Sequence, residues 1–157
     1  MKLFIDSEFT DLVPDNKLIS IALVDENEEF FYAELIDTYE LADCSEFVKN
    51  TVLPLLRGGE YQMSAFDCAL KLGSWIEDRG PDCILACDNP GWDIPHLKRL
   101  LESLWPENLH KNQYHPVYIP YHIQEDIVLE FDYDIHNSLD DAMVMKKATD
   151  LQKNLRY

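Results

Sequence analysis

The first third of the chain alternates short apolar runs with polar turns, which is the pattern of β-strands. We expect strands over residues 2–8, 17–24 and 28–36, with a polar turn, Asp25-Glu26-Asn27, between the second and the third. Consecutive strands with short connections are typical of an antiparallel arrangement. This region therefore predicts three antiparallel strands at the start of a sheet.

Beyond this region the apolar residues recur at helical spacing, and helices alternate with short strands. Ser64 is placed to cap a helix that carries Phe66, Leu70, Gly73 and Ile76 on one stripe. The helices are expected over residues 47–56, 64–78, 93–104 and 138–152, and the strands over residues 83–87 and 116–123. Three antiparallel strands followed by αβ units predict an α/β protein with a mixed β-sheet flanked by helices. Ribonuclease-H-like folds have this order.

The composition is that of one folded domain. The 157 residues match the size of an ordinary domain, and a hydrophobic fraction of 46% is enough to bury a core. No apolar run approaches the roughly 20 residues that span a bilayer. The N-terminus reaches an acidic residue after three apolar ones, unlike a signal peptide. The sequence has no Cys-x-x-Cys pair, so a zinc site of that type is not expected. We expect a single domain over residues 1–157, cytoplasmic, without membrane contact, and with its cysteines in the core.

The net charge of −17 argues against a protein that holds long nucleic acid by bulk electrostatics. An acidic protein can still act on nucleic acid if metal ions supply positive charge at one place. The charge therefore favours short, single-stranded ends over long duplexes as substrates.

Asp6 and Glu8 are the first of three groups of candidate residues. On a strand, residues i and i+2 point to the same face, so both carboxylates project together near the end of the first strand. Two adjacent carboxylates repel each other unless a cation lies between them, which makes the pair a candidate metal site. Alternatively, both are simply solvated at the end of a strand.

The second and third groups lie at the beginnings of helices. Asp93 follows a buried strand and a tight turn, where it is also well placed as a helix N-cap, and Asp88 at the strand end is a competing ligand. Asp141 lies three residues after Ser138, a spacing that resembles a capping box. His136 is either a surface histidine or a side chain that reaches an attacking water molecule.

Together and in this order, the three groups resemble the motifs of the DEDDh 3′–5′ exonucleases, which include oligoribonuclease, ribonuclease T and the proofreading subunits of DNA polymerases. Asp6-Ser7-Glu8 matches the first motif, Asp-x-Glu. Asn89-Pro90-Gly91-Trp92-Asp93 matches the second, Asn-x-x-Phe-Asp, with tryptophan in place of phenylalanine. The segment from His136 to Asp141, followed by Ala142, matches the third, His-x-x-x-x-Asp.

The resemblance extends from residue 6 to about residue 150. It is nearest to the small bacterial and phage exoribonuclease-like branch, and it selects Asp93 over Asp88 and Asp141 over Asp140. The chain departs from the family in its acidity and in its first motif, which reads Asp-Ser-Glu-Phe-Thr where Asp-Thr-Glu-Thr is commoner.

The resemblance implies metal ligands, a general base and substrate contacts. The catalytic ligands, for two ions of Mg²⁺ or Mn²⁺, are Asp6, Glu8, Asp93 and Asp141. The general base is His136, because an imidazole exchanges protons near neutral pH. The contacts to the terminal nucleotide are Glu8, Phe9, Asn89 and Trp92. Alternatively, Trp92 packs under its own helix.

The implied activity is hydrolysis of the phosphodiester at the 3′ end of nucleic acid, with release of nucleoside 5′-monophosphates. RNA is favoured over DNA only through the branch that the chain resembles. Relatives are often dimers, so a homodimer is compatible with the sequence. The alternative function is that of a catalytically silent acidic interaction protein that mimics nucleic acid.

Overall fold

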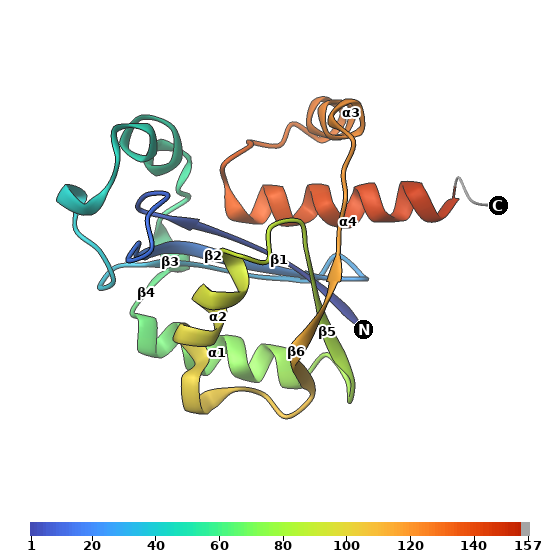
Figure 1. The fold of residues 1–157 in the computed structure, drawn as a ribbon, viewed down its shortest axis with the longest axis horizontal. Coiled ribbons are helices and arrows are strands. Elements are labelled where there is room, and N and C mark those ends of the chain that lie inside the picture. Colours follow the sequence, from blue (N-terminus) through green and yellow to red (C-terminus); the bar gives the residue numbers. More distant parts are fainter. Residues whose placement is uncertain (155–157) are drawn as a thin grey trace.

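The alternating and helical patterns of the chain build one mixed sheet with helices on both faces (Figure 1). The structure is a computed structural model and describes residues 1–154. Its strands are β1 (Lys2–Phe9), β2 (Leu18–Asp25), β3 (Phe30–Leu35), β4 (Gln62–Met63), β5 (Cys83–Cys87) and β6 (Leu109–Pro116). Its α-helices are α1 (Ala65–Glu77), α2 (Asp93–Leu101), α3 (Tyr121–Phe131) and α4 (Ser138–Asn154).

The six described strands lie in the order β4-β3-β2-β1-β5-β6. β2 pairs antiparallel with both β1 and β3, as predicted, whereas β4 runs parallel to β3, β5 parallel to β1 and β6 parallel to β5. This is the topology of a ribonuclease-H-like α/β fold, so the predicted fold class is confirmed. Because β1 and β5 are parallel neighbours at the centre, their carboxyl ends lie at the same edge of the sheet.

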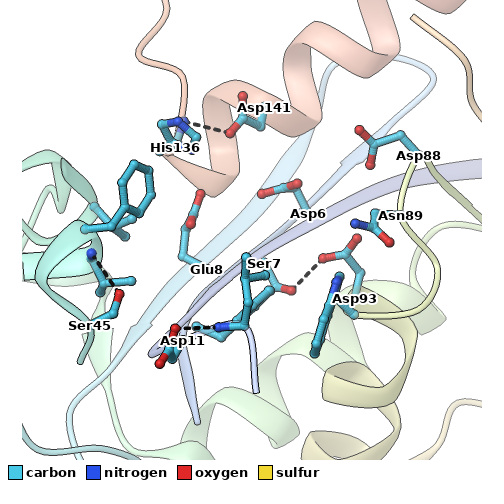
Figure 2. Close-up of a pocket in the computed structure, with 16 residues that line it drawn as sticks. Asp6, Ser7, Glu8, Asp11, Ser45, Asp88, Asn89, Asp93, His136 and Asp141 are labelled. Atoms are coloured by element: carbon cyan, nitrogen blue, oxygen red, sulfur yellow. Dashed lines mark hydrogen bonds between the residues drawn. The ribbon is translucent and has the colours of Figure 1, made fainter. Parts of the chain in front are cut away.

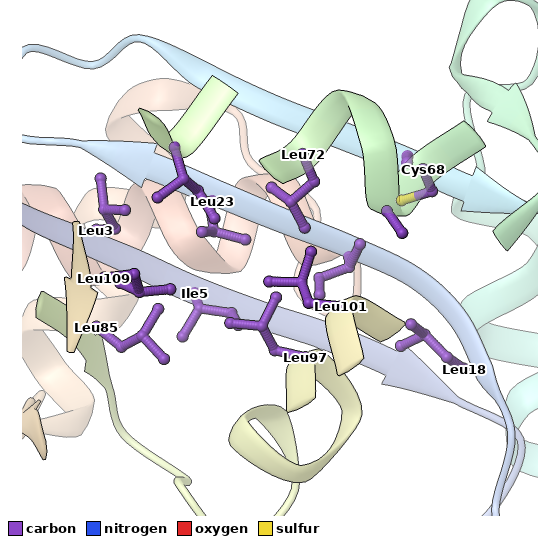
Figure 3. Close-up of a cluster of buried hydrophobic side chains, with 14 of the residues drawn as sticks. Leu3, Ile5, Leu18, Leu23, Cys68, Leu72, Leu85, Leu97, Leu101 and Leu109 are labelled. Carbon is purple, nitrogen blue, oxygen red and sulfur yellow. The ribbon is translucent and has the colours of Figure 1, made fainter. Parts of the chain in front are cut away.

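Alternate residues of β1 separate the two faces of the sheet. Leu3 and Ile5 join a core cluster with residues of α1 and α2, such as Leu72 and Leu97 (Figure 3). Phe4 faces the opposite side, where the buried residues of α4 cover the sheet. α3 packs on α4 through Ile127 and not on the sheet itself. The even-numbered positions of β1, which include Asp6 and Glu8, therefore face α4.

The predicted strand over residues 116–123 is wrong. β6 lies over Leu109–Pro116, and the helix α3 begins at Tyr121 after Pro120. β6 is an edge strand on which only Leu109 is buried, so its sequence lacks the apolar alternation by which a strand is recognised. The apolar residues that follow it belong instead to a turn and to α3, where Ile127 is buried against α4.

The remaining helices agree with the prediction in position and differ in detail. Ser64 caps α1 by accepting a hydrogen bond from the backbone N–H of Asp67, at 3.1 Å. Of the predicted buried stripe of α1, Gly73 and Ile76 are buried, whereas Phe66 and Leu70 are exposed and Leu72 is buried in their place. All four cysteines are buried free thiols, as expected. In residues 1–154, no helix has the length and apolar character needed to cross a bilayer.

Candidate metal centre

The carboxyl ends of β1 and β5 bring the first two groups of candidate residues together. The parallel register pairs Phe4 with Ala86, so its continuation by two residues sets Asp6 beside Asp88. The pairing of β1 with β2 is irregular between Glu8 and Phe9, a feature common next to functional sites. Asp6 and Glu8 project to the α4 side of the sheet, as the i, i+2 spacing predicts (Figure 2).

Asp93 lies at the start of α2, but it does not cap the helix. The N-cap position belongs to Trp92, which makes no side-chain capping bond. The carboxylate of Asp93 instead accepts a hydrogen bond of 2.6 Å from the Ser7 hydroxyl, and its side chain is buried (Figure 2). Ser7 projects from the opposite face of β1 to Asp6 and Glu8, so it ties α2 to the strand. The sequence reasoning assigned no role to Ser7.

The start of α4 holds the third group. Asn137 caps the helix, because its side-chain oxygen accepts hydrogen bonds from the backbone N–H groups of Leu139 and Asp140, at 3.1 and 3.4 Å. The capping role that the sequence suggested for Ser138 therefore belongs to Asn137. Asp141 accepts a hydrogen bond of 2.9 Å from the backbone N–H of His136, whose own backbone is left-handed with φ 76°.

Two contacts from the segment between β3 and β4 hold the start of α4 in place. Arg57 forms an ion pair of 2.6 Å with Asp140, and the Asn137 amide donates a hydrogen bond of 2.9 Å to the carbonyl of Leu55. Asp140 is thereby held away from the candidate site, whereas its neighbour Asp141 faces the site. The ring of Phe47 meets His136 edge-on, with centroids 5.2 Å apart.

These residues line one cavity of about 540 Å³. All the predicted site residues lie in its wall, which they share with Asp88 and Asp11: Asp6, Glu8, Phe9, Asn89, Trp92, Asp93, His136 and Asp141. Two groups within this wall have ligand atoms that lie within 4.8 Å of one another, namely Glu8 with His136 and Asp141, and Asp6 with Asp88 and Asp93. The acidic cluster can therefore hold metal. The catalytic roles of the individual residues stay predictions.

The carboxylates of the cavity repel one another. Burial, followed by repulsion from Asp93, Asp141, Glu8 and Asp88, raises the pKa of Asp6 well above its usual value. Burial also raises the pKa of Glu8 to about 8 and those of Asp93 and Asp141 to about 7, with neighbouring carboxylates adding to the effect. Within the described chain, no lysine or arginine lines the cavity. The negative charge of the site is therefore balanced by none of its own side chains, which fits a site for hard divalent cations.

This imbalance predicts how stability depends on pH and metal. Between the usual carboxyl pKa near 4 and the raised values, the folded protein binds more protons than the unfolded chain, so stability in chelator falls as pH rises. We expect the melting temperature in chelator to fall by on the order of 5 °C between about pH 5.5 and about pH 8. Mn²⁺ should restore the loss at the higher pH, because it binds the ionised carboxylates of the folded state.

Differential scanning fluorimetry tests this dependence. The Glu28 carboxyl does not interfere with this test. Hydrogen bonds from Lys146 and Lys147 lower its pKa, so Glu28 affects stability at a more acidic pH than the interval from about pH 5.5 to about pH 8. A melting temperature that is flat or rises with pH in chelator would contradict the repulsion, and an equal Mn²⁺ effect at both pH values would indicate binding elsewhere.

An aromatic group forms the wall beside the carboxylates. Phe9 lies between Trp92 and His96, with ring centroids at 5.3 and 5.2 Å and interplanar angles of 29° and 23°. Trp92 and Phe9 thus stack on each other, and both line the cavity. The stacking of these rings on a base stays a prediction. Trp92 packs against Phe9 of β1, whereas the alternative had it under its own helix.

Two comparisons with known proteins identify no relative of this chain. No protein-family model matches the chain, and a search of curated proteins finds no match to it. The fold and the acidic cluster are therefore the findings from which a function is inferred.

Proposed function

We propose that the protein is a metal-dependent 3′–5′ exonuclease of the DEDDh type, acting within a single domain and preferring short single-stranded RNA to DNA. The observation that carries the proposal is the cavity in which five carboxylates and His136 converge from β1, the loop after β5 and the starts of α2 and α4. Among residues 1–154, no lysine or arginine lines this cavity. Asp6, Glu8 and Asp88 lie at the carboxyl ends of the neighbouring parallel strands β1 and β5, the edge at which open α/β sheets bind ligands.

The carboxylates divide between two groups, which fits a pair of cation sites. Glu8, Asp141 and the His136 imidazole offer one set of ligand atoms, and Asp6, Asp88 and Asp93 offer the other. Divalent ions held there, Mg²⁺ or Mn²⁺, would supply the positive charge that a phosphodiester requires and would lower the pKa of bound water. Asp88 enlarges the set beyond the four carboxylates of the family motifs.

The other residues of the cavity have roles toward the substrate. His136, at the rim beside Glu8 and Asp141, would take the proton of the attacking water. Phe9 and Trp92 would receive the terminal base, and Asn89, exposed at the same rim, would donate a hydrogen bond to the nucleotide. The product would be a nucleoside 5′-monophosphate.

The test is the incubation of the purified protein with 5′-labelled single-stranded RNA, and with DNA of the same sequence, in Mn²⁺, in Mg²⁺ and in chelator. We expect a ladder that shortens from the 3′ end, requires metal and forms faster on RNA. Internal cleavage would make the protein an endonuclease. Failure to cleave either polymer, with Mn²⁺ still raising the melting temperature, would reject the exonuclease and favour the acidic interaction protein.

A further inference from the structure

A second cavity, of about 260 Å³, lies between α2 and β6. Apolar residues of β5, of α2 and of the loop before α2 form part of its lining, and two lysines, two amides and a tyrosine form the rest. The polar and aromatic residues are Lys98, Lys111, Asn112, Gln113 and Tyr114. These are the side-chain types that bind phosphates, hydrogen-bond to nucleotides and stack on bases.

The charge of this cavity is opposite to that of the molecule. The chain has 30 aspartates and glutamates against 13 lysines and arginines, yet no acidic residue is found in this lining among residues 1–154. Lys98 and Lys111 have no carboxylate partner in the described part of the chain, whereas Lys146 and Lys147 are both paired with Glu28. The positive charge of the two lysines is thus available to an anion from outside.

The two cavities lie on either side of one loop. The connection between β5 and α2 contributes Asp88, Asn89 and Trp92 to the acidic cavity and Pro90 to the second cavity. α2 continues the division, because Asp93 faces the first cavity and Lys98 the second. A strand whose 3′ end lies at the carboxylates could therefore pass over this loop and place its preceding phosphates between α2 and β6.

We propose that the cavity between α2 and β6 binds backbone phosphates of single-stranded nucleic acid upstream of the 3′ end, with Lys98 and Lys111 as the phosphate contacts. This inference rests on the proposed function and extends it, because it gives an acidic protein a local attraction for a polyanion. The amides of Asn112 and Gln113 and the half-exposed ring of Tyr114 add contacts that are independent of charge.

The test compares two double variants that change the net charge equally. Lys98→Gln with Lys111→Gln removes both cations of the cavity. Lys71→Gln with Lys153→Gln removes one exposed cation from α1 and one from the end of α4, which covers the opposite face of the sheet. Binding of a 5′-fluorescent single-stranded oligoribonucleotide is measured by anisotropy in Ca²⁺ over a range of salt concentrations.

We expect the cavity variant to bind about tenfold more weakly and to lose about 1.4 from the slope of log K against log salt, since each phosphate contact to a single strand contributes roughly 0.7. The control variant should stay within about twofold of wild type. Hydrolysis of a nucleoside 5′-monophosphate p-nitrophenyl ester, which has no upstream phosphate, should be equal in all three proteins.

Three results would overturn the inference. Equal weakening in both variants would show that only bulk charge matters, and unchanged binding in the cavity variant would show that the lysines do not contact the strand. Displacement of the oligonucleotide by polyglutamate at equal charge would show that the cavity does not select nucleic acid. In each case, metal-dependent cleavage by wild type would leave the proposed function standing. If only the cavity variant loses affinity and the wild type cleaves nothing, the exonuclease activity is rejected, whereas nucleic-acid binding by the cavity between α2 and β6 is retained.

Discussion

Asp6→Asn is expected to lower the rate of RNA shortening by on the order of 10³-fold, and also to raise the melting temperature of the metal-free protein at about pH 8. Asp6 is the carboxylate that is repelled by all four other carboxylates of the two ligand groups. The amide keeps the shape of the side chain but removes the charge, so a metal ligand is lost. The same change relieves a repulsion that nothing balances in chelator.

The opposite directions of the two effects make the test specific. Rates are measured with labelled RNA in Mn²⁺, and melting temperatures in chelator. Asp11→Asn is the matched control, because Asp11 lines the same cavity but belongs to neither group of converging ligands. We expect Asp11→Asn to leave both quantities near wild type. A loss of activity together with a lower metal-free melting temperature would mean that Asp6 supports the fold rather than a cation.

The sequence predicted the central part of the fold because local patterns determine it. The apolar runs of β1, β2 and β3 are fully or largely buried, and a buried strand leaves an unmistakable pattern. The start of α1 was predicted because Ser64 makes a local bond, between residues three apart. The bounds of α4 agree within a few residues, and Asn137 makes a similar local bond there, whereas α2 begins at Asp93 without a side-chain cap.

The edge of the sheet could not be predicted in this way. β6 pairs with one described neighbour, β5, and most of its side chains are exposed. An exposed strand needs no apolar alternation, so its sequence resembles a loop. The stripe of α1 was predicted only in part for a related reason. Phe66 is 68% exposed, so a large apolar side chain at the start of the helix lies outside the core and misdirects the choice of face.

The candidate site was predicted where it depends on spacing and missed where it depends on tertiary contact. Asp6 and Glu8 lie two residues apart on a strand, which predicts that they share a face, and in the structure both side chains project to the α4 side of β1 (Figure 2). The proximity of Asp88 to Asp6 follows from the register between β1 and β5, which no local pattern reveals. The bond from Ser7 to Asp93 joins residues 86 apart. Only the pairing of distant segments determines such contacts.

The acidity of the chain counted against a nuclease when only its total was known. Its distribution changes this conclusion, because six acidic residues line the first cavity and none of the described lining of the second is acidic. Under the two proposals above, a polyanion would be repelled by the molecule as a whole and attracted at two places, by bound cations in one cavity and by lysines in the other. Such a distribution favours short substrates that meet few other surfaces, and it makes affinity depend strongly on metal.

His136→Asn is expected to lower turnover by about 10²- to 10⁴-fold while leaving metal affinity within a few-fold of wild type. Asn is the informative substitution because the backbone of His136 is left-handed, a conformation that asparagine tolerates better than alanine. The backbone hydrogen bond from residue 136 to Asp141 can then persist, so that the change is confined to the imidazole.

The structure gives this test two distinct outcomes. The imidazole lies near enough to Glu8 and Asp141 to be a third ligand of one group, as well as a base beside it. Metal affinity, measured by calorimetry and by the Mn²⁺-induced rise in melting temperature, separates these roles. If His136→Asn loses Mn²⁺ as severely as Asp6→Asn, His136 is a ligand and the general-base assignment is wrong. If Mn²⁺ binding persists while turnover is lost, the imidazole acts on the water, and the carboxylates alone hold the cations.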